Sequence, residues 1–338
     1  MAIQSELTRG LLSPLSYPLF MNKDLKLSDF RLNRKLGNIS REEYWLKVQE
    51  SLSTFTSLQS LFSNKITKIE VFSDKMVLDY SITSDSNLRM FLDPQDLRSA
   101  PMTIICEGSY EPLLSKILFQ AGKNARTFLD VGANAGFYSL SLAILYPSVK
   151  IFSFDPNVDV TNLLSQNMEI NNLRNRITVV NTAVGSKLEE SKTLFIPKLT
   201  GTGGGSLNNL HPEEGRPVTR EIKVDTLDNY IGNMEPIDLI KIDVEGFELE
   251  VIKGSEKLIE KWHPIIFVEL LRKWMAPFSA HPQDVLNFLG KKDYFCFSIS
   301  EEKISRVNVI DANTYETNFI FVHQADQINL DLLNEYMI

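Results

Sequence analysis

A short glycine-containing segment is the strongest chemical signal in the sequence. Residues 128–137 read FLDVGANAGF, so an apolar run leads into a turn with Gly132 and Gly136 and then into a second apolar stretch. Glycine allows a sharp bend after a strand and lets a ligand approach the backbone closely. Backbone N–H groups in such a turn are expected to point at an anion above the helix N-terminus. The segment therefore predicts a nucleotide-like ligand at the carboxyl edge of a sheet.

The glycine spacing and one acidic residue limit the nature of this ligand. The turn G-A-N-A-G has neither the G-x-G-x-x-G spacing of dinucleotide sites nor the G-K-[ST] of a phosphate loop, which argues against NAD and ATP. Asp130 opens the motif, where a pyrophosphate would be repelled. A carboxylate at this place suits a ligand with positive charge, such as the amino group or the sulfonium region of S-adenosylmethionine. Asp130, Gly132 and Gly136 are therefore predicted to bind this cofactor.

Two further segments bring polar or small residues to the same edge. Asp155 ends the second predicted strand, about 20 residues beyond the glycine turn, where an acidic side chain can accept hydrogen bonds from two ribose hydroxyls. The alternative is that Asp155 only caps the following helix. Ala183 follows the third strand, and a small side chain there would leave room for an adenine ring.

The segment 238–248, DLIKIDVEGFE, places carboxylates directly after a buried strand. Asp243 and Glu245 stand two residues apart at the strand terminus. An acid at this edge costs free energy unless it binds or catalyses, so Asp243 is assigned a functional role. Glu248 and Glu250 are expected on a solvated helix surface, where Glu248 is favourable to the helix dipole.

The elements that must position these residues alternate between strand and helix from residue 110 onward. Strands are predicted at residues 127–131, 150–154, 177–181, 237–243, 264–270, 294–299 and 318–322. Helices are predicted at residues 110–120, 135–145, 160–170, 247–260 and 282–289. This alternation predicts an α/β fold whose parallel sheet is covered on both faces. The glycine-rich stretch between Leu194 and Val224 breaks the pattern and is interpreted as a long loop, either mobile on the surface or a lid.

The first 108 residues are predicted to form a separate helical and β-hairpin extension, and residues 109–338 the catalytic domain. Ser40 and Glu43 fit a capping box for an amphipathic helix that ends near residue 62. Short strands are predicted at residues 68–72, 76–82, 88–92 and 102–106, with a tight turn at residues 73–74. The extension is expected to contact the substrate or a second copy of the chain, so a homodimer is possible.

Composition limits the class of protein. The chain has 338 residues, with 35 Lys and Arg against 43 Asp and Glu, a net charge of −8 that argues against a nucleic-acid partner. Two cysteines form neither a disulfide framework nor a metal knuckle, which favours the reducing cytoplasm. The longest apolar run, residues 264–271, contains Glu269 and is too short to span a bilayer. Residues 1–20 lack the unbroken apolar core of a secretion signal.

Taken together, these motifs resemble the FkbM family of S-adenosylmethionine-dependent methyltransferases. The matching segments lie in order over roughly residues 105–300: GSYEP at 108–112, DVGANAG at 130–136, DPN at 155–157, AVG at 183–185, TLD at 226–228, IKIDVEG at 240–246 and VEL at 268–270. One departure is Asp155, where the family more often carries Glu. Asp can still reach a ribose, so the cofactor assignment stands.

The resemblance implies a Rossmann-like class I methyltransferase fold, a seven-stranded and mostly parallel sheet whose last strand is antiparallel. It adds Glu111, Ala133, Asn134 and Asn157 to the expected cofactor-binding residues, beside Asp243. It also implies O-methylation of a hydroxyl group on a sugar, a glycan or another natural-product acceptor.

Transfer of a methyl group to a hydroxyl needs a general base. The candidates are Asp243, Glu245, His263 and Glu269. Glu269 ends a very apolar strand, where burial would raise its pKa and make it a better base. His263 precedes Pro264 and is expected to be a loop residue.

Other interpretations stay open at this point. Asp243, Glu245 and Glu269 could hold Mg²⁺ with water molecules, although no metal site is the main expectation, and no histidine spacing supports zinc. An N- or C-methyltransferase would share the same cofactor site. A NAD-dependent oxidoreductase lacks its glycine fingerprint, and a non-catalytic scaffold would retain the fold without turnover.

Overall fold

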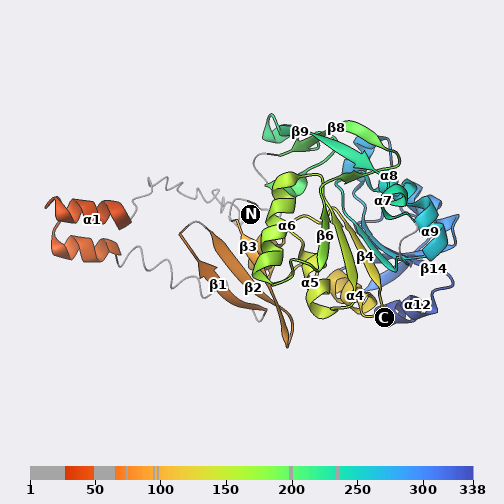
Figure 1. The fold of residues 1–338 in the computed structure, drawn as a ribbon, viewed down its shortest axis with the longest axis horizontal. Helices are drawn as coiled ribbons and strands as arrows, with labels where there is room; N and C mark the ends of the chain where they lie inside the picture. The colour runs from red at the N-terminus through yellow and green to blue at the C-terminus, as the bar shows by residue number, and fades with distance from the viewer. Residues whose placement is uncertain are drawn as a thin grey trace, which may run out of the picture. The chain divides into compact units, whose positions relative to one another are not determined.

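The computed structural model describes residues 27–48, 65–73, 75–93, 96, 99–197, 201–232 and 236–337 (Figure 1). Contacts between residues divide the chain into two compact units, residues 1–60 and residues 61–338. No helix of the described residues is long and apolar enough to cross a membrane.

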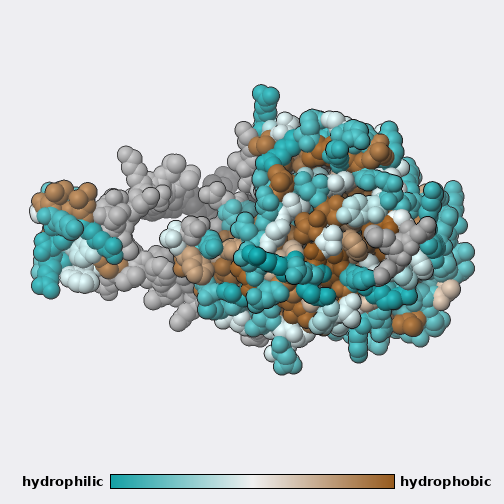
Figure 2. Space-filling view, in the orientation of Figure 1, coloured by the Kyte–Doolittle hydropathy of each residue, from teal (hydrophilic) through white to brown (hydrophobic). Residues whose placement is uncertain are grey.

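The described part of the first unit consists of two short helices. Helix α1 spans Leu27–Lys35, and residues 41–48 are helical. The backbone N–H of Ser40 donates to Glu43 Oε2 at 2.8 Å, and the N–H of Glu43 donates to Ser40 Oγ at 3.0 Å. This reciprocal pair confirms the predicted capping box, while the predicted end of the helix near residue 62 lies outside the described residues. Figure 2 shows apolar and polar atoms side by side on the visible face of this unit.

A mixed eight-stranded sheet forms the centre of the second unit. Its strand order is β13-β12-β14-β11-β10-β4-β5-β6. The strands are β4 Thr127–Val131, β5 Lys150–Phe154, β6 Ile177–Val180, β10 Leu239–Ile242, β11 Ile265–Glu269, β12 Tyr294–Ile299, β13 Ile304–Val307 and β14 Asn318–His323. Strand β14 runs antiparallel to both neighbours, β11 and β12, as expected for the last strand. The predicted count of seven strands omitted β13, a four-residue edge strand with two exposed residues.

Helices cover both faces of this sheet and enclose two separate hydrophobic cores (Figure 1). The helices are α3 Ala100–Glu107, α4 Pro112–Gly122, α5 Phe137–Leu145, α6 Val158–Ile170, α7 Leu227–Ile231, α8 Glu248–Lys253, α9 Glu256–Trp262, α10 Arg272–Met275, α11 Pro282–Gly290 and α12 Gln327–Asn334. Side chains of α4, α5, α6 and α12 pack on one face, and those of α7, α8, α9 and α11 on the other. Because the central strands are buried on both sides, their sequences read as continuous apolar runs rather than as alternating ones.

A three-stranded antiparallel sheet packs against the α4–α6 face. It consists of β1 Ile66–Val71, β2 Met76–Thr83 and β3 Ser86–Leu92. Its residues Leu78, Leu88 and Met90 belong to the same hydrophobic core as α4 and α5. The three predicted strands are therefore confirmed, and part of the predicted extension shares a core with the larger sheet.

Residues 102–106, predicted to be a strand, lie in helix α3, so that prediction was wrong. The helix begins after Ser99, has Pro101 in its first turn, and ends at Gly108 with φ 81°. These are the usual start and stop signals of a helix, and they outweigh the short apolar run.

The stretch predicted to be one long loop between Leu194 and Val224 is partly strand. Strands β8 Glu189–Ile196 and β9 Val218–Asp225 form a hairpin, and β7 Ala183–Val184 joins it in a second small sheet (Figure 1). The connecting segment is thus confined to residues 197–217. The helix predicted at 247–260 is divided into α8 and α9 after Lys253. Glycine at position 254 lets the backbone approach Gly185 closely, because a Cβ there would lie 1.9 Å from the Gly185 carbonyl oxygen.

Candidate functional site

A cavity of about 460 Å³ opens at the carboxyl ends of β4, β5, β10 and β11. Apart from the candidate base His263, the residues that the sequence predicted for cofactor binding or catalysis all line it: Glu111, Asp130, Gly132, Ala133, Asn134, Gly136, Asp155, Asn157, Ala183, Asp243, Glu245 and Glu269. Parallel strands bring their carboxyl ends to one edge of a sheet, so segments over 150 residues apart in sequence meet there.

The glycine turn between β4 and α5 requires glycine at two positions. Gly132 has φ 82° and Gly136 has φ 91°, a region that other residues rarely adopt. A Cβ at Gly132 would lie 1.7 Å from the carbonyl oxygen of Asp243, and one at Gly136 would lie 2.2 Å from Leu164 Cδ1. The two glycines therefore allow the turn to approach β10 and α6.

The N–H groups of this turn are already bonded within the protein. Gly132 and Ala133 both donate to the carbonyl oxygen of Phe154, at 2.9 and 3.0 Å. The N–H of Asn134 donates to Asp155 Oδ2 at 3.1 Å, and the remaining two N–H groups of residues 132–136 donate inside the turn itself. The expectation that these groups point at a bound anion was wrong, because each of them has its acceptor in the chain.

Asp155 lies directly after β5 and joins the glycine turn to α6. Its Oδ2 accepts from Asn134 N, and its Oδ1 accepts from Asn157 N at 2.9 Å. The helix cap is Asn157, whose side chain accepts from Asp159 N, so Asp155 is not the residue that caps α6. Burial raises the pKa of Asp155 to about 6, although the two backbone N–H bonds oppose the rise.

Asn157 has an unused donor at the wall of the cavity. The residue is 2% exposed, and its Nδ2 has no hydrogen-bond partner among the described residues. A buried amide donor without a partner costs free energy, so a ligand acceptor at this place would be stabilising. Ala183 in β7 lines the same cavity and is also buried.

Asp130 lies deeper than the other acidic residues. It is 2% exposed, and its Oδ2 accepts from Ser139 Oγ at 2.5 Å. Burial raises its pKa, while the Lys241 ammonium and the Ser139 hydroxyl oppose the rise. Asp130 therefore places a buried carboxyl group near the end of β4, shortly before the glycine turn.

Glu111 is held in place by two partners. The hydroxyl of Tyr138 donates to its Oε2, and Asn318 Nδ2 donates to its Oε1 at 3.2 Å. Its backbone has φ 41°, a left-handed conformation for a residue with a side chain, at the start of α4. The carboxylate thus links α4, α5 and β14 at the rim of the cavity.

Lys241 is the residue that sequence analysis missed. It is 4% exposed in the middle of β10, and its Nζ lies 2.9 Å from Asp243 Oδ2. Burial disfavours the ammonium, but the carboxylates of Asp243, Glu111 and Asp130 raise its pKa above the ordinary value. The sequence did carry a signal for this residue, because a lysine stands within the otherwise apolar strand sequence I-K-I.

The segment after β10 folds back sharply, with φ 55° at Glu245 and φ 102° at Gly246. Glu248 stabilises this bend, because its Oε1 accepts from Gly246 N at 2.8 Å and from Val244 N at 3.3 Å. Glu248 is 2% exposed, so the expectation of a solvated Glu248 was wrong. Glu250 is partly exposed and pairs with Lys253 at 2.7 Å.

The remaining candidate bases lie at different ends of β11. Glu269 ends the strand at the cavity, and burial together with the carboxylates of Asp243 and Glu111 raises its pKa well above the ordinary value. His263 precedes the strand at the opposite end and stacks on His323 with a ring distance of 3.8 Å. His263 is therefore outside this cavity.

Two further segments complete the wall. Gly203, Gly205, Ser206 and Leu207 come from the segment between β8 and β9, and Ser206 Oγ donates to the carbonyl oxygen of Glu245 at 2.8 Å. Met90, Ala100 and Thr103 come from β3 and α3.

The charge of the cavity is strongly negative. Six carboxylates line it, those of Glu111, Asp130, Asp155, Asp243, Glu245 and Glu269. Among its described lining residues, Lys241 is the one basic side chain. Within the described part of the chain, no three His, Cys, Asp or Glu side chains are placed to hold a metal ion, so the Mg²⁺ alternative finds no support.

Comparisons with known proteins agree with the sequence motifs. A family model described as the methyltransferase FkbM domain matches residues 130–296. Methyltransferase sdnD of Sordaria araneosa is 29% identical over 171 residues, which cover 40% of this chain and 66% of that protein. Hexuronic acid methyltransferase AglP of Haloferax volcanii is 26% identical over 176 residues, which cover 52% of this chain and 66% of that protein. The chain thus spans slightly less than two thirds of these curated relatives.

Among solved structures, the methyltransferase FkbM from Methylobacillus flagellatus KT matches with 18% sequence identity and a TM-score of 0.37. The match covers 58% of this chain and 43% of that chain.

Proposed function

Because this chain belongs to the FkbM family of methyltransferases, we propose that it transfers a methyl group from S-adenosylmethionine to a hydroxyl group of a sugar, a glycan or another natural product. The curated relatives are named as methyltransferases, one of them for a hexuronic acid. These names support the reaction class and a sugar-type acceptor.

The charge of the cavity is the observation that carries this proposal. Six carboxylates and one lysine attract a cationic ligand and repel a phosphate. The N–H groups of the glycine turn are all used inside the protein, so the turn offers nothing to a pyrophosphate. Both features favour S-adenosylmethionine over NAD.

The residues of the cavity fit this cofactor. Each oxygen of Asp155 accepts one backbone N–H and retains a lone pair, so the carboxylate can still accept from ribose hydroxyls. The unused Nδ2 of Asn157 can donate to the same part of the ligand. The small side chain of Ala183 leaves space for the base. When bound, S-adenosylmethionine supplies a methyl group on a positively charged sulfur.

Glu269 is the proposed general base. Its raised pKa makes its carboxylate a stronger base than an exposed glutamate, which suits removal of a hydroxyl proton. The Asp243 carboxylate is engaged by the Lys241 ammonium, so we assign it to holding charge in the cofactor site. Met90, Ala100 and Thr103, which come from β3 and α3, are proposed to face the acceptor.

Calorimetric titration of the purified protein with S-adenosylhomocysteine and, separately, with NAD⁺ tests the cofactor. The wild type should bind S-adenosylhomocysteine and give no heat with NAD⁺. Asp155→Ala should weaken binding at least tenfold, about 1.4 kcal/mol, because the ribose contact is lost.

Asp159→Ala is the matched control, since Asp159 lies four residues further on, is half exposed and pairs with Arg220 outside the cavity. It should bind like the wild type. Binding of NAD⁺, or a wild type that binds neither ligand, would contradict the proposed cofactor.

A further inference from the structure

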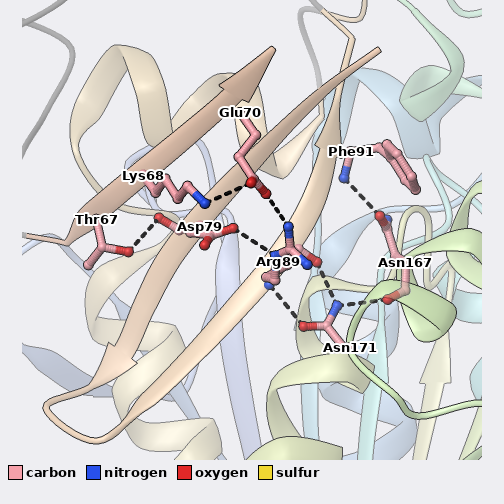
Figure 3. Close-up of polar contacts among 8 residues, drawn as sticks. All are labelled: Thr67, Lys68, Glu70, Asp79, Arg89, Phe91, Asn167 and Asn171. Carbon is pink, nitrogen blue, oxygen red and sulfur yellow. Dashed lines mark hydrogen bonds and ion pairs between the residues drawn. The ribbon is translucent and has the colours of Figure 1, made fainter. Parts of the chain in front are cut away.

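Helix α6 and the residue that caps its C-terminus present two asparagines, four residues apart, to the outer edge of strand β3 (Figure 3). Asn167 Oδ1 accepts from Phe91 N at 2.8 Å. Asn171 Oδ1 accepts from Arg89 N at 3.0 Å, and its Nδ2 donates to the carbonyl oxygen of Arg89 at 2.6 Å. Four helical residues rise about 6 Å and two strand residues about 6.7 Å, so the asparagines match alternate residues of the strand.

These side chains replace the backbone partner that β3 lacks. The strand order β1-β2-β3 leaves β3 at the edge of its sheet, where N–H and C=O groups would be unpaired. On its inner side β3 pairs with β2, and the Arg89 guanidinium reaches across to Asp79 of β2 at 3.0 Å and to Glu70 of β1 (Figure 3). The position of β3 is thus fixed from both sides.

Asn167 also reaches the glycine turn. Its Nδ2 donates to the carbonyl oxygen of Ala135 at 2.9 Å, and the residue is fully buried. One side chain therefore joins β3 to the turn proposed to bind the cofactor. The hydrogen bonds of the Asn171 amide go to Arg89 and to the carbonyl oxygen of Asn167.

The two ends of this connection lie in the wall of the same cavity. Met90, between the two anchored residues of β3, lines the cavity, and so does Ala135. A shift of β3 relative to the turn would therefore move Met90, on the side proposed to face the acceptor, relative to the residues proposed to bind the cofactor.

We propose that Asn167 is a positioning residue that holds the glycine turn in register with β3 and so couples the Met90 wall to cofactor binding. This inference rests on the proposed function for its ligand. Asn167 is expected to affect cofactor binding through its bond to Ala135, whereas Asn171 has no bond to the turn and is not expected to have this effect.

Substitutions of the two asparagines separate the support of β3 from the support of the glycine turn. Asn167→Asp keeps an acceptor for Phe91 N but places a second oxygen against the Ala135 carbonyl, and Asn167→Ala removes both bonds. Asn171→Ala is the matched control, since it loses contacts to β3 but not to the turn. Both Asn167 variants should weaken S-adenosylhomocysteine binding at least tenfold in calorimetry, and Asn171→Ala should change it less than threefold.

Two further readouts test the inference, and the second of them needs no ligand. Lowering the pH from 8 to 5 should restore much of the affinity of Asn167→Asp relative to wild type, because a protonated carboxyl can donate to Ala135 again. Hydrogen exchange at residues 132–136 should be faster in the folded Asn167 variants than in Asn171→Ala.

The outcomes distinguish the two proposals. If the wild type does not bind S-adenosylhomocysteine, the proposed cofactor fails, and hydrogen exchange still decides whether Asn167 holds the turn. If the wild type binds while the variants of both asparagines behave alike in affinity and in exchange, Asn167 is only a packing residue and the coupling is wrong.

Discussion

Lys241 shows how a single side chain sets the charge balance of the cavity. A buried lysine is unfavourable on its own, but Asp243 lies 2.9 Å away and Glu111 and Asp130 add to the field. One ammonium cannot neutralise six carboxylates. Part of the remaining charge is removed by protonation, because the pKa values of Asp155 and Glu269 are raised by burial. A cationic ligand would oppose that protonation, so its binding is expected to release protons.

Glu248 gives a pH-dependent prediction at this scale. Burial raises its pKa from 4.5 to about 7, so its contribution to stability is complete below pH 4.5 and is lost as the pH rises through about 7. Glutamine does not titrate and can keep the bond from Gly246. The free energy of unfolding of Glu248→Gln, relative to wild type, should therefore increase by roughly 3 kcal/mol between pH 4 and pH 8.

Urea unfolding at several pH values measures this difference. Glu250→Gln is the control: burial alone would raise the pKa of Glu250, but Lys253 and Ser186 lower it below 4.5. This variant should show no such slope between pH 5 and pH 8. Parallel curves for Glu248→Gln and wild type over that range would show that Glu248 keeps an ordinary pKa.

At the scale of elements, the buried strands were the most predictable part of the fold. Strands β4, β5 and β12 begin and end at the predicted residues, because strands covered on both faces are short apolar runs between polar turns. Helix α3 was misread because residues 102–106, four of them apolar, form too short a run to show a helical period. Strands β8 and β9 were missed because few of their residues are buried, so their sequences are largely polar and resemble a loop.

The candidate site was predictable where residues follow strand ends in sequence. Asp155, Asp243 and Glu269 were found in this way, and all line the cavity. Lys241 was missed because its role depends on neighbouring strands that the sequence alone does not align. Glu248 was missed because the bend at Gly246 turns a residue of the first helical turn inward.

The turn between β4 and α5 gives a prediction about close approach. Gly132→Ala would place a Cβ 1.7 Å from a backbone oxygen of Asp243, so β4 and β10 would have to separate. Gly215→Ala is the control, since Gly215 has a similar φ of 86° but nothing within 4 Å of its Cβ. Gly215→Ala should be destabilised only by the cost of holding alanine at φ 86° and ψ −156°, about 1–3 kcal/mol.

Chemical denaturation compares the two variants. Gly132→Ala should lose at least about 2 kcal/mol more stability than Gly215→Ala, because the clash with the Asp243 carbonyl oxygen adds to the cost of a positive φ. Equal losses would mean that the turn has room to move, and the close approach of β4 and β10 would then not explain the glycine.

At the scale of the whole molecule, the position of the domain boundary decides which part of the chain folds alone. The sequence predicts a boundary after residue 108, whereas residue contacts divide the chain after Ser60. Between these positions, Leu78, Leu88 and Met90 of the small sheet lie in the same core as α4 and α5. The cavity also takes Met90, Ala100 and Thr103 from this interval, and no described residue before Met90 lines it.

Two truncated chains test where the folding unit begins. Residues 61–338 keep the whole shared core and the cavity, so this fragment should unfold cooperatively and bind S-adenosylhomocysteine within about threefold of the full chain. Residues 109–338 lose the side chains that cover α4–α6, and their exposed apolar face should cause aggregation or loss of cooperative unfolding. Circular dichroism melts, light scattering and calorimetry compare the two fragments. A stable 109–338 fragment that still binds S-adenosylhomocysteine would support the boundary after residue 108. The small sheet would then not be needed for folding or binding, because the glycine turn would keep its geometry without β3 beside it.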